Sequence, residues 1–208
     1  MVCKQSQRVI AYIDGFNLYF GLKTKGWQRY YWLNLQALMA NLLKPDQRLV
    51  HTKYFTARVQ GPPAKVQRQA TFLEALDTLP DFSIYYGQYF LTRRVCRKCG
   101  FEDLVPSEKM SDVNIAVELL SDAFKDRFDT ALLVSADSDL KGPVETVLRE
   151  FPAKRIVAVF PPARHSVALG QIASAYLTIG RAKLDRSTFP PQVRRQDGFV
   201  LQQPASWK

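Results

Sequence analysis

Cysteine and histidine are scarce in this sequence, whose 208 residues include three cysteines and two histidines. So few cysteines, in an odd number, do not form the disulfide framework of a small secreted domain. The first residues, MVCKQSQR, lack the apolar stretch of a signal peptide. We therefore expect a cytoplasmic protein. The two histidines, His51 and His165, stand alone in the sequence, and we expect surface or core residues there rather than general bases.

Long apolar runs and glycine-rich nucleotide motifs are also missing. No apolar run approaches the roughly 18 residues that a membrane span needs, so we expect no membrane partner. Neither GxGxxG nor a GxxxxGK sequence followed by Ser or Thr occurs. The sequence therefore offers no support for a dinucleotide site or a P-loop.

Acidic residues are the minority charge. Lys and Arg total 29 against 19 Asp and Glu, which leaves a formal net charge of +10. A surface this basic favours a polyanionic partner, and nucleic acid is the commonest one. The alternative is an ordinary solvated surface.

Apolar residues are abundant, at 47% of the chain, which suffices for one domain with a real core. We expect that domain to span residues 1–184. The tail, residues 185–208, is polar and contains prolines, and we expect it to pack on the domain or to be partly mobile. The sequence leaves homo-oligomer formation open.

Strand-like and helical segments alternate along the chain. Short apolar or β-rich runs predict strands at 8–13, 49–59, 82–91, 130–135 and 155–161. Helical periodicity predicts helices at 33–43, 66–79, 112–124, 144–151 and 166–179, the last running into a short strand. The stretch 93–109 reads as polar, basic and irregular. Continuously apolar strands alternating with helices predict an α/β fold with a parallel sheet covered on both faces.

Four aspartates stand at the boundaries of these elements. Asp14 follows the first predicted strand, Asp137 and Asp139 follow the strand at 130–135, and Asp112 begins a predicted helix. Ligands of parallel sheets gather at the carboxyl ends of the strands. We therefore expect the four carboxylates to converge and to hold Mg²⁺ or Mn²⁺, which prefer oxygen ligands.

Each aspartate also has a purely structural interpretation. Asp14-Gly15 is a common turn sequence, and Asp112 suits a helix N-terminus. Asp137 and Asp139 fit a loop and a helix cap. The functional interpretation depends on all four positions taken together.

Three segments carry a family resemblance: IDGFNLY, KMSDVNIAVELL and LLVSADSDL, in this order. Together they resemble the signature segments of the NYN domain family of PIN-like metal-dependent ribonucleases, over roughly residues 8–180. The resemblance implies a three-layer α/β/α sandwich around a mostly parallel sheet. It also implies a divalent-metal ribonuclease site in which Asp14, Asp112, Asp137 and Asp139 take the acidic positions and Asn17 the polar one.

The chain departs from that family pattern at two positions. Glu118 stands where relatives often carry Asp, which is a mild change. Ser174 stands where many relatives carry Asp in the last helix, which puts a role for that position in doubt. We also expect Asn17, together with Ser135 or Ser138, to orient ligands or water.

Basic and aromatic residues are interleaved after residue 82. Arg93 and Arg94 belong to a basic run that follows several tyrosines. Such a mixture suits single-stranded RNA, whose bases stack and whose phosphates pair with cations. Aromatics that simply fill the core are the alternative. Arg164 follows a predicted strand end, and Lys109 precedes Asp112, so both are expected to contact phosphate.

Cys96 and Cys99, in the sequence CRKC, have the spacing of half a zinc site. A complete Zn²⁺ site would need two more ligands, and a reduced pair of thiols in a loop is the alternative.

We therefore expect a metal-dependent (endo)ribonuclease that hydrolyses RNA phosphodiester bonds. The two alternatives are a non-catalytic RNA-binding module and a DNA-directed nuclease of related fold.

Overall fold

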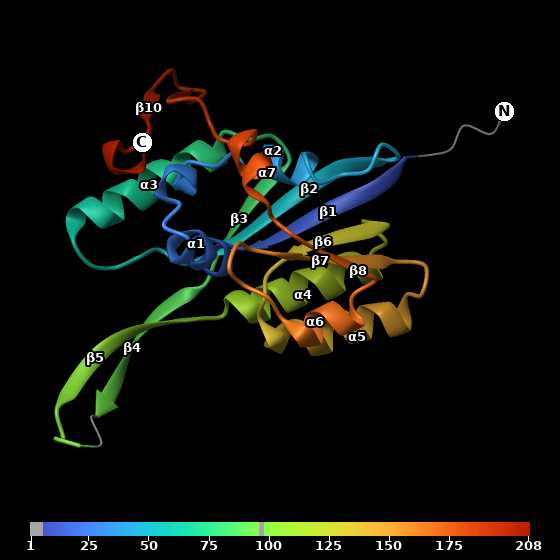
Figure 1. The fold of residues 1–208 in the computed structure, drawn as a ribbon, viewed down its shortest axis with the longest axis horizontal. Coiled ribbons are helices and arrows are strands. Elements are labelled where there is room, and N and C mark those ends of the chain that lie inside the picture. The colour runs from blue at the N-terminus through green and yellow to red at the C-terminus, as the bar shows by residue number, and fades with distance from the viewer. Residues whose placement is uncertain (1–5, 96–97) are drawn as a thin grey trace.

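A six-stranded parallel sheet forms the centre of the molecule in the computed structural model, which describes residues 6–95 and 98–208 (Figure 1). For residues 89–92, 94 and 103–109 it describes the backbone alone. In spatial order the strands are β3 (Phe82–Tyr86), β2 (Gln47–Thr56), β1 (Gln7–Asp14), β6 (Thr130–Val134), β7 (Arg155–Phe160) and β8 (Ala175–Thr178). Every neighbouring pair in this sheet is parallel.

Helices cover both faces of the sheet, which confirms the predicted three-layer α/β fold (Figure 1). One face carries α1 (Gly15–Thr24), α2 (Leu35–Ala40), α3 (Pro63–Asp77) and α7 (Arg181–Asp185). The other face carries α4 (Ser111–Phe124), α5 (Lys141–Glu150) and α6 (Val167–Ile172). None of the helices in the described part of the chain is long and apolar enough to cross a membrane.

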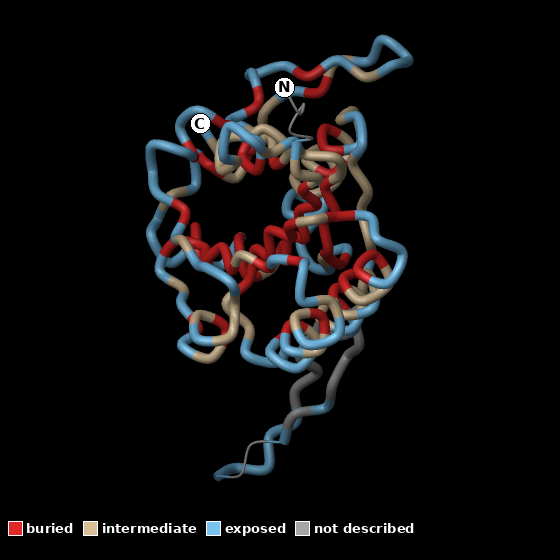
Figure 2. The backbone as a smooth tube through the Cα atoms, turned by 90° about the vertical axis from the view of Figure 1, so that its right-hand side faces the viewer, coloured by how far each residue is buried: buried red, intermediate tan, exposed pale blue. Residues whose placement is uncertain are grey.

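Strand β1 shows why these apolar runs become central strands. Val9, Ala11 and Ile13 point into the core under α1–α3, whereas Ile10 and Tyr12 point into the core under α4–α6. Successive side chains of a strand face opposite sides, so a strand covered on both faces must be apolar throughout. Figure 2 shows the buried residues concentrated along the centre of the molecule.

Two stripes of apolar side chains run along helix α4, and only one of them is buried. Val113, Val117 and Phe124 are 53%, 57% and 81% exposed, whereas Ile115 and Leu119 are fully buried. Both stripes have helical spacing, so periodicity alone does not decide which of them faces the sheet.

The predicted strand at 82–91 divides into two parts. Residues up to Tyr86 form β3 of the central sheet, and the chain then continues into β4 (Gln88–Val95). Strand β4 pairs antiparallel with β5 (Glu102–Lys109), in a stretch that the sequence predicted to be irregular. This hairpin extends away from the body of the molecule (Figure 1).

The C-terminal segment packs on the α2–α3 side of the domain. The Trp32 indole donates a hydrogen bond to the carbonyl of Pro190 at 2.8 Å, and the Phe189 and Trp32 ring centroids are 5.6 Å apart. Val193 and Leu201, in the small β9 (Gln192–Arg194) and β10 (Val200–Gln202) pair, are buried in the same core. A last 3₁₀ turn, η3 (Ala205–Trp207), follows.

The strand order reverses between β1 and β6. From β1 the chain proceeds to β2 and β3 on one side, and from β6 to β7 and β8 on the other. Such a switch point opens a crevice at the carboxyl ends of the two central strands, where ligands of α/β sheets bind. Asp14 is the last residue of β1, and Ser135 follows β6 directly.

Candidate active site

Asp14 lies buried at the switch point, with 3% of its surface exposed. Its Oδ1 accepts a hydrogen bond from the Asn17 backbone N–H at 2.9 Å, and this bond caps α1. Its Oδ2 accepts bonds from the Asn17 side-chain amide at 2.7 Å and from the Ser135 hydroxyl at 3.0 Å. These neutral donors hold the carboxylate in one orientation and help offset the cost of its burial.

Gly15 is required for this geometry by a close approach of two elements. A Cβ atom built on Gly15 would lie 2.6 Å from the Tyr54 hydroxyl and 2.8 Å from the Phe55 carbonyl oxygen. Any side chain would therefore push the start of α1 away from β2. Glycine lets α1 begin directly at the end of β1, with Asp14 as its cap.

Ser135 connects Asp14 to the loop after β6. The fully buried Ser135 hydroxyl accepts a hydrogen bond from the Asp137 backbone N–H at 3.0 Å while it donates to Asp14. Asp137 Oδ1 in turn accepts from the Asp139 N–H at 3.0 Å and caps the 3₁₀ turn η2 (Ser138–Leu140). Asp137 is half-buried and Asp139 is exposed, so solvent reaches the site from this side.

Asn17 joins a cation to the network. Its Oδ1 accepts from the Ala136 N–H and from Arg164 Nη1, each at 3.3 Å. Arg164 comes from the loop after β7, and its buried Nε has no hydrogen-bond partner among the described residues. An unsatisfied guanidinium donor at this point of the network suits an anionic ligand with oxygen acceptors.

Asp112 approaches the same edge from the first turn of α4. The neighbouring Asn114 amide donates to the carbonyl of Tyr86, the last residue of β3, at 3.4 Å. The N-terminal turn of α4 therefore lies beside the carboxyl end of β3. The hydrogen bonds of the switch point connect Asp14, Asp137 and Asp139, while Asp112 stands on the β3 side of the edge.

The donor chemistry of this edge suits a hard divalent cation. Across the described part of the chain, no three or more His, Cys, Asp or Glu side chains form a group that could hold a metal ion by themselves. Mg²⁺, however, usually binds through one or two carboxylates and completes its shell with water and substrate phosphate oxygens. Asp14 and Asp137, linked through Ser135, offer carboxylate oxygens of this kind.

The other predicted site residues lie in varied places. Arg93 forms an ion pair with Glu102 across the β4–β5 hairpin. Ser138 is exposed in η2. Cys99 is an exposed free thiol. Cys96 and the side chains of Arg94 and Lys109 lie outside the described residues, so the zinc half-site stays a prediction.

A buried charge network on the α4 side was not predicted. Lys53, 4% exposed, donates to Glu118 Oε2 at 2.6 Å and to Asp122 Oδ2 at 2.5 Å. Burial by itself would lower the pKa of Lys53, but the two carboxylates outweigh it and raise that pKa above its usual value. Tyr12 and Tyr85 donate to Asp122 and Glu118. Glu118, the departure from the family pattern, thus pairs with a buried cation here.

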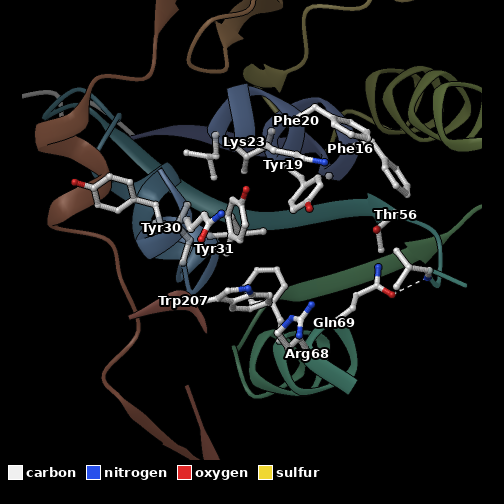
Figure 3. A pocket seen from close by; sticks show the side chains of 18 of the residues that line it. Phe16, Tyr19, Phe20, Lys23, Tyr30, Tyr31, Thr56, Arg68, Gln69 and Trp207 are labelled. Atoms are coloured by element: carbon white, nitrogen blue, oxygen red, sulfur yellow. Dashed lines mark hydrogen bonds between the residues drawn. The ribbon is translucent and has the colours of Figure 1, made fainter. Parts of the chain in front are cut away.

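A pocket beside the switch point was also not predicted. It measures about 480 Å³ and lies between α1, α3 and the C-terminal Trp207 (Figure 3). The only sequence signal for its α1 side is the i, i+3, i+4 spacing of Phe16, Tyr19 and Phe20.

The sequence and the fold are each similar to those of known proteins. The chain is 28% identical over 190 residues to 6-hydroxy-3-succinoylpyridine 3-monooxygenase HspA from Pseudomonas putida (strain DSM 28022 / S16). The match covers 74% of this chain and spans 59% of the length of that relative. The crystal structure of a protein of unknown function from Vibrio parahaemolyticus RIMD 2210633 has the same fold, with a TM-score of 0.58 at 18% identity. That match covers 91% of this chain and 100% of the other.

The family comparison covers most of the chain. The model of the NYN domain matches residues 8–180, which include Asp14, Asp112, Asp137 and Asp139. The fold is accordingly of the nuclease-like, PIN-like type. The chain belongs to the NYN domain family.

Proposed function

We propose that the protein is a metal-dependent ribonuclease that hydrolyses phosphodiester bonds of RNA at the β1–β6 switch point. One observation carries the proposal: a buried carboxylate, Asp14, is tied through Ser135 to the solvent-facing Asp137 and Asp139. The site therefore combines a rigid anionic floor with accessible carboxylates in a chain of nuclease-like fold.

The residues of the site have different roles in this proposal. Asn17 and Ser135 are positioning groups, since their hydrogen bonds orient Asp14 and the loop that carries Asp137. Asp137 and Asp139 face solvent and would orient the attacking water and accept its proton. Arg164 would pair with a phosphate oxygen and offset the negative charge that develops on phosphorus.

Asp14 and Asp137 would hold Mg²⁺ or Mn²⁺, and Asp112 and Asp139 would contribute through coordinated water. Such an ion neutralises phosphodiester charge and lowers the pKa of a coordinated water. In the reaction, the water oxygen bonds to phosphorus and the bond from phosphorus to the 3′ oxygen breaks. The 3′ oxygen takes up a proton, which leaves a 5′-phosphate and a 3′-hydroxyl.

The positive surface supports a nucleic acid substrate. The net charge of +10 attracts a polyanion, and the site itself is acidic. Binding should therefore come from cations around the site, and cleavage from the carboxylates within it.

The assay compares a labelled single-stranded RNA with DNA of the same sequence, with Mn²⁺ or with a chelator. We expect RNA cleavage that the chelator stops. Preferential cleavage of DNA would support the DNA-directed alternative instead. RNA binding without cleavage under any of these conditions would support a non-catalytic binding module.

The activity named for HspA belongs to a longer relative at 28% identity, so it is not carried over to this chain. A direct control is to incubate the protein with 6-hydroxy-3-succinoylpyridine, oxygen and a reduced nicotinamide. If the protein converted that compound and left RNA uncleaved, the ribonuclease proposal would be wrong and a monooxygenase activity would take its place.

A further inference from the structure

The pocket beside the switch point is built from four separate parts of the chain. Helix α1 and the 3₁₀ turn η1 (Gln28–Tyr31) form one wall, and α3 forms the opposite wall. The end of β2, with Tyr54 and Thr56, forms its floor, and Trp207 from η3 lies between Tyr31 and Arg68 (Figure 3). Its volume of about 480 Å³ lies within the range of small-molecule sites.

Aromatic rings dominate the lining. Tyr19 and Tyr31 have ring centroids 5.0 Å apart, and Tyr31 packs edge-to-face on Trp207 at 5.7 Å. Trp207 also packs edge-to-face on Phe72 of α3, with ring centroids 6.2 Å apart. Tyr19 is 36% exposed, and Tyr31 and Trp207 are half-buried, so these rings are partly accessible. Accessible rings around a cavity are the surfaces on which nucleobases stack.

The charge of the lining is positive. Lys23, Lys65 and Arg68 line the pocket, and none of the described residues that line it is acidic. In Figure 3 the guanidinium of Arg68 lies beside Trp207, across the pocket from Tyr19 and Tyr31. A flat apolar group that carries a negative charge matches this combination, and a nucleotide has both properties.

The pocket adjoins the acidic network through α1. Gly15 lines the pocket and directly follows Asp14. Phe20 lines the pocket as well, and the Arg164 guanidinium lies 5.8 Å from its ring centroid. Helix α1, which Asp14 caps, therefore presents Asn17 to the switch point and its aromatic side chains to the pocket. The pocket and the switch point therefore both adjoin the start of α1.

We propose that this pocket binds the unpaired base of a nucleotide adjacent to the phosphodiester that is cleaved. The base stacks among Tyr19, Tyr31 and Trp207, and Lys65 and Arg68 contact the phosphate on the side away from Asp14. A paired base cannot enter such a pocket, so the substrate is single-stranded RNA. This inference rests on the proposed ribonuclease function for the identity of the ligand.

Binding is measured in chelator, so that cleavage does not intervene, with an RNA of ten adenylates and a ten-residue abasic ribose-phosphate chain. We expect Tyr19→Leu and Arg68→Gln each to raise the Kd for the RNA by roughly tenfold. Matched controls are Tyr176→Leu on β8 and Arg48→Gln near the start of β2, which should leave Kd unchanged. Both control residues are exposed and do not line the pocket.

A second readout is the emission of Trp207. The oligoadenylate should quench the protein's fluorescence, the abasic chain should not, and Trp207→Phe should remove the quenched component. Equal Kd values for oligoadenylate and abasic chain, or pocket variants that bind RNA as tightly as the parent, would overturn the pocket assignment. Neither result would contradict the nuclease proposal, because that proposal is tested separately by the cleavage assay. Pocket-dependent binding without cleavage would leave the pocket assignment standing and remove the nuclease.

Discussion

Ser135 and Asp14 are joined by a 3.0 Å hydrogen bond between a hydroxyl and a carboxylate that lie 121 residues apart in the chain. The same hydroxyl accepts the Asp137 N–H, so one buried side chain sets both the floor of the site and its solvent-facing loop. The bond exists because β1 and β6 are neighbours in the sheet and end at the same level. Ser135 is therefore a positioning residue for both aspartates.

Ser135→Ala should lower stability and cleavage together. The change removes a donor from buried Asp14 and an acceptor from the Asp137 N–H, at a cost of about 1–3 kcal/mol. The control is Ser187→Ala, since Ser187 is equally buried and bonds Asn41 and the Lys183 carbonyl away from the site. Urea unfolding and kcat/KM on single-stranded RNA are measured. If both variants lose the same stability but cleave like the parent, Ser135 has no positioning role.

Asp137→Asn should abolish cleavage and leave RNA binding intact or slightly tighter. The change removes one ligand charge while it keeps the shape of the side chain and reduces repulsion of phosphate. Asp77→Asn is the matched control, because Asp77 is an exposed acid at the far end of α3. Cleavage by Asp137→Asn at the rate of the parent would contradict the assignment of the site.

Mn²⁺ should raise the melting temperature of the parent protein. A cation that binds only the folded chain stabilises it by mass action, so the shift should grow with metal concentration. The shift should shrink in Asp137→Asn and persist in Asp77→Asn. The melting temperatures are compared by differential scanning fluorimetry at micromolar to millimolar Mn²⁺. A parent melting temperature that does not change with Mn²⁺ would count against a metal site.

Lys53→Met should destabilise the fold severely. The change removes the buried cation that pairs with Glu118 and with the fully buried Asp122, and breaking a buried pair typically costs about 3–5 kcal/mol. Arg127, 3.2 Å from Asp122, is a cation that remains and should keep the loss at the lower end. Arg149→Met, at an exposed pair with Glu150, should change stability by less than about 1 kcal/mol. The double variant Lys53→Met, Asp122→Asn should recover part of the loss in urea unfolding. No recovery would mean that packing, rather than charge, explains the effect.

Acid should weaken the ion pair of Arg8 and Asp129, which joins the start of β1 to the loop before β6. Arg8 donates hydrogen bonds to Asp129, and these bonds hold the pKa of that carboxyl below its usual value. A lowered folded-state pKa adds stability that is present above the ordinary carboxyl pKa and is lost as pH falls through the folded value. Asp129→Asn should therefore be less stable than the parent at pH 6, and the difference should close as pH falls below the ordinary carboxyl pKa and through the lowered folded-state value. Asp46→Asn, at an exposed acid, should follow the parent at every pH.

The amino-acid sequence by itself determined the layered fold and the edge at which the site lies. A pattern of apolar strands alternating with amphipathic helices is compatible with few folds other than a parallel sheet covered on both faces. The strands of a parallel sheet have their carboxyl ends at one edge. Asp14 and Asp137 follow strands that read clearly in the sequence, so their shared location could be predicted. The motif spacing around them also identified the family.

Tertiary structure alone decided what each side chain at that edge contacts. Ser135 as the bridge, Arg164 against Asn17 and Lys53 beneath Glu118 are contacts between residues far apart in sequence, and local periodicity carries no information on such pairs. The same holds for the pocket, whose walls come from α1, α3 and Trp207, and for α4, where two stripes of equal spacing compete. Packing chose between them, because only one stripe faces a sheet that can bury it.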